Sequence, residues 1–269
     1  MNGKTILLSF PRGCTRVVFV RREKRFFAIC RDPHGNEFAA HTNNTGSMTG
    51  LLPSKGPLHR LALLSPAASP KRVLQWTLEA VSLGRYPTAD PDAFHEETPV
   101  RWAGVNTSVP NRILRAAFFH DRSQDACDAP LLPWAAGYTH YKGEARHEES
   151  RLDALLTDPG GKLRPLWVEC KNVSLCEDGG AAYFPDAVSE RGAKHLGTLQ
   201  KLAGTGCRAA MLFVVQHPDA SCFAPADFID AEYADKLGEA ARSGVEIYAL
   251  GTRINEQGVS VSGYLPVKV

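Results

Sequence analysis

The segment RAAMLFVVQ, residues 208–216, is almost continuously apolar. A run of this kind is typical of a strand buried on both faces, as in the middle of a sheet that helices cover on each side. A helical pattern over residues 186–203 precedes it, and a helix near 230–242 and a strand at 245–250 follow. The order predicts an α/β domain with a mixed central sheet, and we expect this domain to span residues 104–269.

The first part of the chain has a different pattern, with short apolar runs separated by turn residues. Five such runs within one short stretch favour a small β-barrel, most simply an OB-fold-like domain that binds nucleic acid and spans residues 1–83. The expected strands are residues 17–20, 26–30, 37–41, 58–64 and 73–83. Residues 84–103, rich in Pro, Asp and Glu, are expected to be a linker or insertion, as are residues 120–137. The predicted fold class is therefore α+β with two domains.

Charge is distributed unevenly along the chain. Residues 1–31 contain eight Lys/Arg and one acid, a net of +7, which leaves −5 for residues 32–269. A basic module beside an acidic body suits a polyanionic partner, and Arg22 and Arg25 are candidate phosphate contacts. The alternative is a solvated basic face with no partner.

The cysteine content and the hydropathy pattern indicate the compartment. The chain has seven cysteines, an odd number, and no CxxC pair, so reduced thiols are expected rather than a disulfide framework or a structural zinc site. No apolar run approaches the roughly 20 residues of a membrane span. We therefore expect a cytoplasmic protein with no membrane partner.

Residues 150–172, SRLDALLTDPGGKLRPLWVECKN, predict a β-hairpin that carries the candidate chemistry. The turn signal at residues 158–161 separates two strands. If the hairpin is symmetric about Gly161, Asp153 and Glu169 lie opposite each other on one face, and Lys171 shares that face. Cys170, between them, points to the other side as a core thiol.

Two adjacent carboxylates repel each other unless a proton or a cation lies between them. A divalent ion such as Mg²⁺ or Mn²⁺ satisfies both, because it prefers oxygen ligands and keeps water in its other positions. With Lys171 to position that water, the implied reaction is phosphodiester hydrolysis. The alternative is a structural Glu169–Lys171 pair beside a half-exposed Asp153.

The predicted helix at residues 186–203 follows this hairpin, and Asp186 is its expected N-cap. Its buried stripe is expected to comprise Val188, Gly192, His195, Leu199 and Leu202. Histidine in such a stripe is usually a hydrogen-bonded core residue. Here it would lie beside the Glu169–Lys171 strand.

Basic side chains around this helix are candidate backbone contacts for nucleic acid. Arg191, Lys194 and His195, together with Arg151 on the hairpin, would hold the phosphate backbone. For Lys194 the alternative is a surface pair with Glu190 at i,i+4 spacing.

Six blocks of the sequence resemble the sugar fermentation stimulation protein A (SfsA) family, and the resemblance covers most of residues 15–267. They are NNTGSMTGLL (43–52), GVNTSVPNRIL (104–114), AGYTHYKGEARHEESRLDALL (136–156), WVECKNVSL (167–175), YFPDAVSERGAKHL (183–196) and RAAMLFVVQ (208–216). One departure is Ser47, where the family usually has Arg; it removes a plausible phosphate contact.

The resemblance implies an OB-fold domain followed by a PD-(D/E)xK nuclease-like domain. The nuclease motif corresponds to Asp153, Glu169 and Lys171, and the backbone carbonyl of Cys170 would be a further ligand of Mg²⁺ or Mn²⁺. No organic cofactor is implied.

Two functions remain open from the sequence. One is a metal-dependent nuclease acting on DNA, with RNA as a further substrate. The other is a non-specific DNA-binding regulator of sugar (maltose) metabolism that has the nuclease-like fold without turnover. Nucleases of this class often dimerise to cut both strands, so a homodimer is an open alternative.

Overall fold

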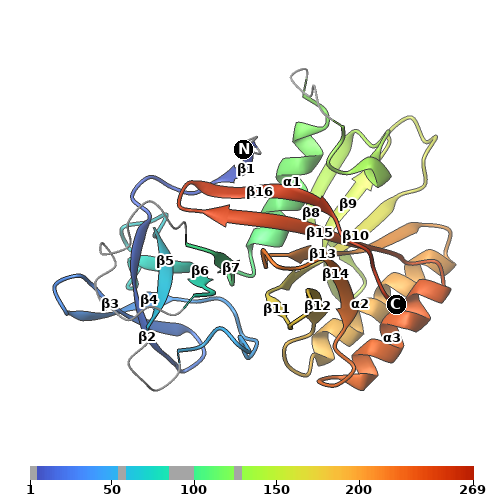
Figure 1. Ribbon diagram of the computed structural model, residues 1–269. Coiled ribbons are helices and arrows are strands. Elements are labelled where there is room, and N and C mark those ends of the chain that lie inside the picture. The colour runs from blue at the N-terminus through green and yellow to red at the C-terminus, as the bar shows by residue number, and fades with distance from the viewer. Residues whose placement is uncertain (1–4, 54–58, 85–99, 124–128) are drawn as a thin grey trace.

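The computed structural model describes residues 5–53, 59–84, 100–123 and 129–269 (Figure 1). Most of the expected linker at residues 84–103 and part of the expected insertion at residues 120–137 lie outside these ranges. The described residues form a barrel and a larger sheet with helices on both faces. No helix among them is long and apolar enough to cross a membrane.

Five strands near the N-terminus form a closed barrel, as the sequence predicts. They are β2 (Thr15–Glu23), β3 (Phe27–Arg31), β4 (Glu37–His41), β5 (Arg60–Pro66) and β6 (Trp76–Ser82). The strand order is β4-β3-β2-β5-β6, and the parallel pairing of His41 with Thr77 joins β4 to β6. The barrel is filled by alternate apolar side chains, among them Phe19, Leu64 and Leu78, which are almost fully buried.

The second domain is built on a seven-stranded mixed sheet of order β1-β16-β15-β13-β10-β9-β8. Its strands are β1 (Ile6–Ser9), β8 (His140–His147), β9 (Ser150–Thr157), β10 (Leu166–Val173), β13 (Arg208–Val215), β15 (Glu246–Asn255) and β16 (Gly258–Tyr264). Strands β10, β13 and β15 are parallel, and the other neighbours pair antiparallel. A smaller sheet contains β11 (Leu175–Cys176), β12 (Ala181–Phe184) and β14 (Cys222–Pro225).

Two strands lie outside the ranges that the sequence suggested. Strand β1, near the N-terminus, pairs with β16 and thus belongs to the sheet of the second domain. Strand β7 (Trp102–Gly104), expected in the linker, pairs with β6 at the barrel. The two domains are therefore connected through the sheets themselves as well as through the chain.

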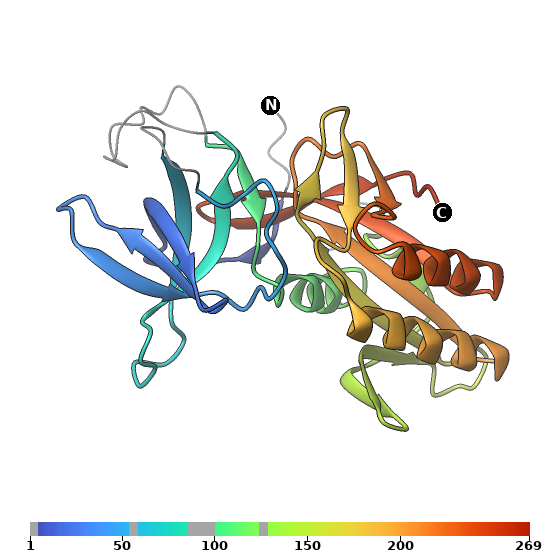
Figure 2. The same ribbon diagram turned by 90° about the horizontal axis from the view of Figure 1, so that it is seen from below.

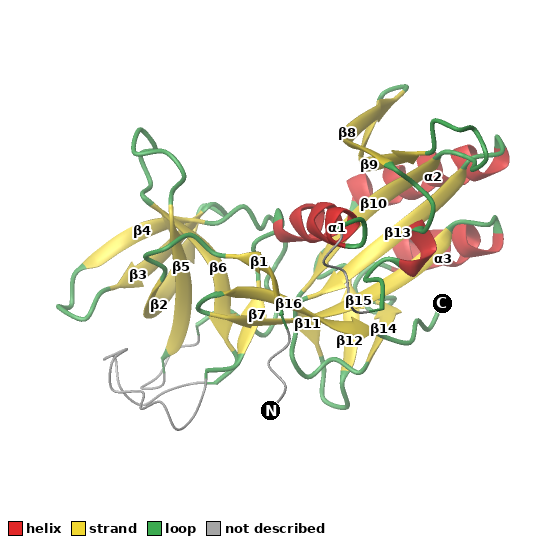
Figure 3. Ribbon diagram, turned by 90° about the horizontal axis from the view of Figure 1, so that it is seen from above, coloured by secondary structure: helices red, strands yellow, loops and turns green. Residues whose placement is uncertain are grey.

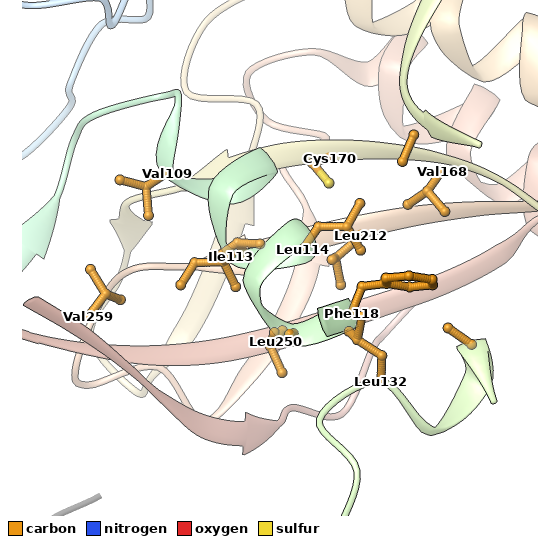
Figure 4. Close-up of a cluster of buried hydrophobic side chains, with 14 of the residues drawn as sticks. Val109, Ile113, Leu114, Phe118, Leu132, Val168, Cys170, Leu212, Leu250 and Val259 are labelled. Atoms are coloured by element: carbon orange, nitrogen blue, oxygen red, sulfur yellow. The ribbon is translucent and has the colours of Figure 1, made fainter. Parts of the chain in front are cut away.

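Helices cover both faces of the large sheet. Helix α1 (Val109–His120) lies on one face, and α2 (Glu190–Gly204) and α3 (Ala231–Arg242) lie on the other (Figures 2 and 3). Strand β13 supplies both cores: Leu212 packs with Ile113 of α1 (Figure 4), whereas Phe213 packs with the side chains of α2 and α3. The apolar run at residues 208–216 is thus buried on both faces, as predicted.

The beginning of α2 differs from the prediction. The N-cap is Ser189, whose hydroxyl accepts a hydrogen bond from the Gly192 amide at 3.2 Å, and the helix begins at Glu190. Asp186, expected to cap the helix, instead accepts a hydrogen bond from the backbone amide of Met48. Val188, expected in the buried stripe, precedes the helix and is 73% exposed. The other four expected stripe residues are buried.

Candidate metal and nucleic-acid site

A cavity of about 360 Å³ lies between the barrel and the second domain, and it contains the three predicted catalytic residues. Its floor is the C-terminal half of β10, with Glu169 and Lys171. One wall is the barrel loop at residues 44–46, and the opposite wall is the segment at residues 183–189 with the first turns of α2. Thr107, just before α1, and Asn111 in its first turn line the remaining side.

Asp153 comes from β9 and is held by two donors. Asn111 Nδ2 donates to Oδ1 at 2.6 Å, and the Cys170 backbone amide donates to Oδ2 at 2.7 Å. Burial, with the neighbouring charge of Glu169, nevertheless raises the pKa of Asp153 to about 6. The site thus favours a proton or a cation on this carboxylate.

Glu169 is 3% exposed and is surrounded by positive and polar groups. Lys171 Nζ donates to Oε1 at 2.6 Å, and His195 Nδ1 contacts the same oxygen. Burial acts to raise the pKa of Glu169, but Lys171 and His195 outweigh it and hold that pKa below its ordinary value. Its second oxygen, Oε2, is buried and has no hydrogen-bond partner in the described part of the chain.

These residues fit a divalent cation. A buried carboxylate oxygen without a partner is costly unless something else satisfies it. Glu169 Oε2 supplies one such oxygen, and each Asp153 oxygen keeps acceptor capacity beyond its single recorded hydrogen bond. Among the described residues no group of three or more His, Cys, Asp or Glu is arranged as a metal site. Any cation here would thus depend on two carboxylates, a backbone carbonyl and water.

The hairpin register agrees with the sequence prediction up to the site itself. Leu166 pairs with Leu156, Trp167 with Leu155 and Val168 with Ala154, in the register expected for a turn centred on Gly161. The pairing of β9 with β10 does not continue beyond Val168 and Ala154, so Asp153 and Glu169 are not paired across the two strands. Instead, the Asp153 carboxylate accepts a hydrogen bond from the backbone amide of Cys170. The Cys170 side chain belongs to the core on the α1 side, as predicted.

The predicted nucleic-acid contacts fall into two groups. Arg191 and His195 line the cavity, and Arg191 forms no ion pair with a described carboxylate. Arg151 and Lys194 lie outside the cavity, where Arg151 pairs with Glu144 at 3.2 Å and Lys194 lies 3.9 Å from Glu149. His195 Nδ1 is hydrogen-bonded to Glu169 Oε1, so its first role here is to orient that carboxylate.

The two barrel arginines have different surroundings. Arg22 donates to the carbonyl oxygens of Asn44, Gly46 and Arg25, and it therefore holds the loop that forms a wall of the cavity. Arg25 is exposed in the turn after β2. Arg25 thus remains the freer of the two candidates for phosphate contact.

Sequence reasoning missed Asn111 and Asp186. No local pattern around Asn111 indicates that its amide holds Asp153. Asp186 Oδ2 accepts from the Met48 amide at 2.8 Å, and its backbone carbonyl accepts from the Ser47 hydroxyl. The only signal in the sequence was the presence of both residues in blocks shared with the family, which says nothing of their partners.

If Asp153 holds a divalent cation, replacing Asn111 by Ala is expected to weaken Mn²⁺ binding about 10- to 100-fold, because the partner that orients this carboxylate is lost. Calorimetric titration of the purified protein measures this. Arg115→Ala, an exposed position on the same helix, is the matched control and should bind as the wild type does. Equal affinity in Asn111→Ala and wild type would show that Asp153 is held without this bond.

Fold and site together define a class: an OB barrel joined to a mixed-sheet α/β domain with a carboxylate pair and a lysine at its central strand. Family comparison is consistent with this. The SfsA N-terminal OB domain matches residues 20–87, and the sugar fermentation stimulation protein RE domain matches residues 108–258. The chain belongs to the sugar fermentation stimulation protein family.

Relatives match over nearly the full length. A sugar fermentation stimulation protein homolog from Maridesulfovibrio salexigens is 46% identical, with 97% of each chain covered. The homolog from Syntrophobacter fumaroxidans is 43% identical, over 97% of this chain and 87% of the relative. The solved structure of Pyrococcus furiosus SfsA in complex with Ca²⁺ superposes with a TM-score of 0.78 at 27% identity, covering 98% of this chain and 100% of that one.

Proposed function

We propose that this protein is a metal-dependent nuclease that hydrolyses phosphodiester bonds in DNA, with RNA as a further substrate. The observation that carries the proposal is the buried, unpartnered Oε2 of Glu169 in a cavity that also holds Asp153 and Lys171. The Ca²⁺ complex described for the Pyrococcus furiosus relative supports a divalent-cation site in this fold.

Asp153, Glu169 and the Cys170 carbonyl are the proposed ligands for Mg²⁺ or Mn²⁺. When bound, such an ion supplies charge neutralisation for the phosphodiester and makes water more acidic. The residues of the chain fix the geometry: Asn111 and the Cys170 amide orient Asp153, and His195 orients Glu169.

Lys171 is the proposed catalytic cation. Its ammonium group has three N–H donors; one is bonded to Glu169 and a second lies 3.4 Å from His195 Nδ1, which leaves a third. The Lys171 side chain is 14% exposed and lines the cavity, so a donor can reach a phosphate oxygen or the attacking water there. Arg191, across the cavity, would hold an adjacent phosphate.

The test of this proposal combines metal binding with cleavage. Wild-type protein is incubated with DNA and with RNA in Mg²⁺, Mn²⁺ or EDTA, and Mn²⁺ binding is measured by calorimetry on wild type and Asp153→Asn. We expect cleavage only with a divalent ion, and no Mn²⁺ heat in the variant. Salt-sensitive DNA binding without Mn²⁺ heat and without cleavage would contradict the proposal and favour a DNA-binding regulator.

Mn²⁺ should raise the melting temperature less as the pH falls below about 6. Asp153 has a folded-state pKa of about 6, above its ordinary value of 3.8, so a proton displaces the cation below that pH. In EDTA, the free energy of unfolding should fall as the pH rises from 3.8 to about 6, because the folded state keeps a proton on this buried carboxylate that the unfolded state has already released. Thermal melts across this range, with Mn²⁺ and with EDTA, measure both effects. A Mn²⁺ shift that is constant down to pH 4 would argue against Asp153 as a ligand.

A further inference from the structure

Two walls of the cavity, which come from different domains, are joined to each other above its floor. Met48 donates its backbone amide to Asp186 Oδ2 at 2.8 Å, and the Ser47 hydroxyl donates to the Asp186 carbonyl oxygen. At Gly46 a Cβ atom would clash with the Asp186 carboxylate, so a larger residue there would have to displace the side chain that bonds to Met48. We call residues 46–48 together with Asp186 the bridge.

The bridge is fixed from the barrel side as well. Arg22 Nη1 donates to the Gly46 carbonyl oxygen at 2.6 Å, and the same guanidinium donates to Asn44. The carboxylate that would carry the metal, Glu169, is 3% exposed on the floor. A phosphodiester that approaches Glu169 through this cavity of about 360 Å³ passes the bridge, whose residues Gly46 and Asp186 line one side of it.

This geometry restricts the conformation of the substrate. In a duplex, the backbone is attached to stacked and paired bases, so the walls on either side of this cavity hinder its entry more than they hinder that of an unpaired strand. Enzymes that act on a base take the nucleotide out of the helix into a pocket, and a substrate that is already single-stranded avoids the cost of unpairing. A flexible single strand meets no such barrier.

The walls suit the parts of an unpaired nucleotide. The segment at residues 183–188 forms a largely apolar and aromatic wall that Asp186 of the bridge interrupts; its other members are Tyr183, Phe184, Pro185, Ala187 and Val188. Tyr183 packs against the half-exposed Phe228, with ring centroids 5.1 Å apart at 81°. Aromatic side chains of this kind stack with unpaired bases regardless of sequence. The opposite wall presents the polar groups of Asn44 and Thr45, and Lys171 and Arg191 supply positive charge.

We infer that the substrate is single-stranded nucleic acid, whose backbone enters under the bridge while an unpaired base stacks on Tyr183. The inference rests on the proposed nuclease function for cleavage. Binding tests the single-strand preference independently of turnover.

The experiment compares a fluorescein-labelled oligodeoxynucleotide with its blunt-ended duplex. Binding is measured by anisotropy in Ca²⁺, and cleavage is measured in Mn²⁺, with the full chain in both. We expect the single strand to be bound and cut at least about tenfold better than the duplex. Tyr183→Leu should lower single-strand binding about 5- to 150-fold, the range for one lost base–aromatic stack. Tyr183→Phe, the matched control, keeps the ring and should stay within about threefold.

Asp186→Ala is the second variant and does not depend on the folding of Tyr183→Leu. Without the Asp186 carboxylate the bridge loses its bond to Met48, so the preference for single strands over duplex should shrink. Duplex bound or cut as well as the single strand by wild type would overturn the inference and leave the nuclease proposal standing. Equal losses in Tyr183→Leu and Tyr183→Phe would also overturn it. Cleavage of neither substrate would overturn the nuclease proposal, and the anisotropy ratio would still decide strand preference.

Discussion

Lys171→Met is expected to lower the rate of DNA cleavage about 100- to 1,000-fold, the range for removing one donor from a preorganised site. Mn²⁺ binding should not weaken, because Lys171 Nζ lies 2.6 Å from Glu169 and competes with a cation for that carboxylate. Rates under single-turnover conditions and calorimetric titration separate the two effects.

Lys162→Met is the matched control, because Lys162 is exposed in the hairpin turn on the same pair of strands. It should cleave and bind Mn²⁺ as the wild type does. If Lys171→Met lost Mn²⁺ binding and cleavage together, Lys171 would be acting only through Glu169, and the catalytic role proposed for it would be wrong.

Phe213→Ala is expected to destabilise the fold by about 3–5 kcal/mol, as is typical of a buried phenylalanine that leaves a cavity. Phe213 is fully buried on β13 beneath α2 and α3, with its ring stacked 4.1 Å from that of Phe223 and 5.6 Å from that of Phe184. Urea unfolding followed by circular dichroism measures the loss.

Phe26→Ala, at a position 47% exposed in the turn after β2, is the comparison for this loss. It should cost less than about 1 kcal/mol, as surface substitutions usually do. Equal losses at the two positions would mean that β13 is not the centre of the core in solution.

Local patterns predicted a large part of this fold. The apolar run at residues 208–216 identified the doubly covered strand, and the turn at residues 158–161 gave the register of three pairs in the hairpin. The same register brought Asp153, Glu169 and Lys171 toward one cavity. These features depend on strand periodicity and turn chemistry, which short stretches of sequence determine.

Contacts between distant segments could not be predicted in this way. Strand β1 pairs with β16 across almost the whole chain, and no periodicity within Ile6–Ser9 indicates its partner. Asn111 meets Asp153 because α1 crosses the sheet, which the helical pattern does not specify.

Asp186 shows how tertiary contacts override a local preference. Aspartate suits a helix N-cap, but Ser189 is the N-cap here. The Asp186 carboxylate instead accepts a hydrogen bond from the Met48 amide in the barrel loop. The helix consequently starts later than predicted, and Val188 is left at the rim of the cavity.

The most direct test of the proposed metal-dependent site compares wild type with Glu169→Gln in the same cleavage assay with Mn²⁺. The substitution keeps the size of the side chain but removes the charge and one carboxylate oxygen of the proposed ligand set. We predict that the wild type cuts DNA with Mn²⁺ and does not cut it in EDTA. Glu169→Gln, shown to be folded by its melting curve, should give no detectable cleavage. Cutting by Glu169→Gln at the wild-type rate would contradict the account.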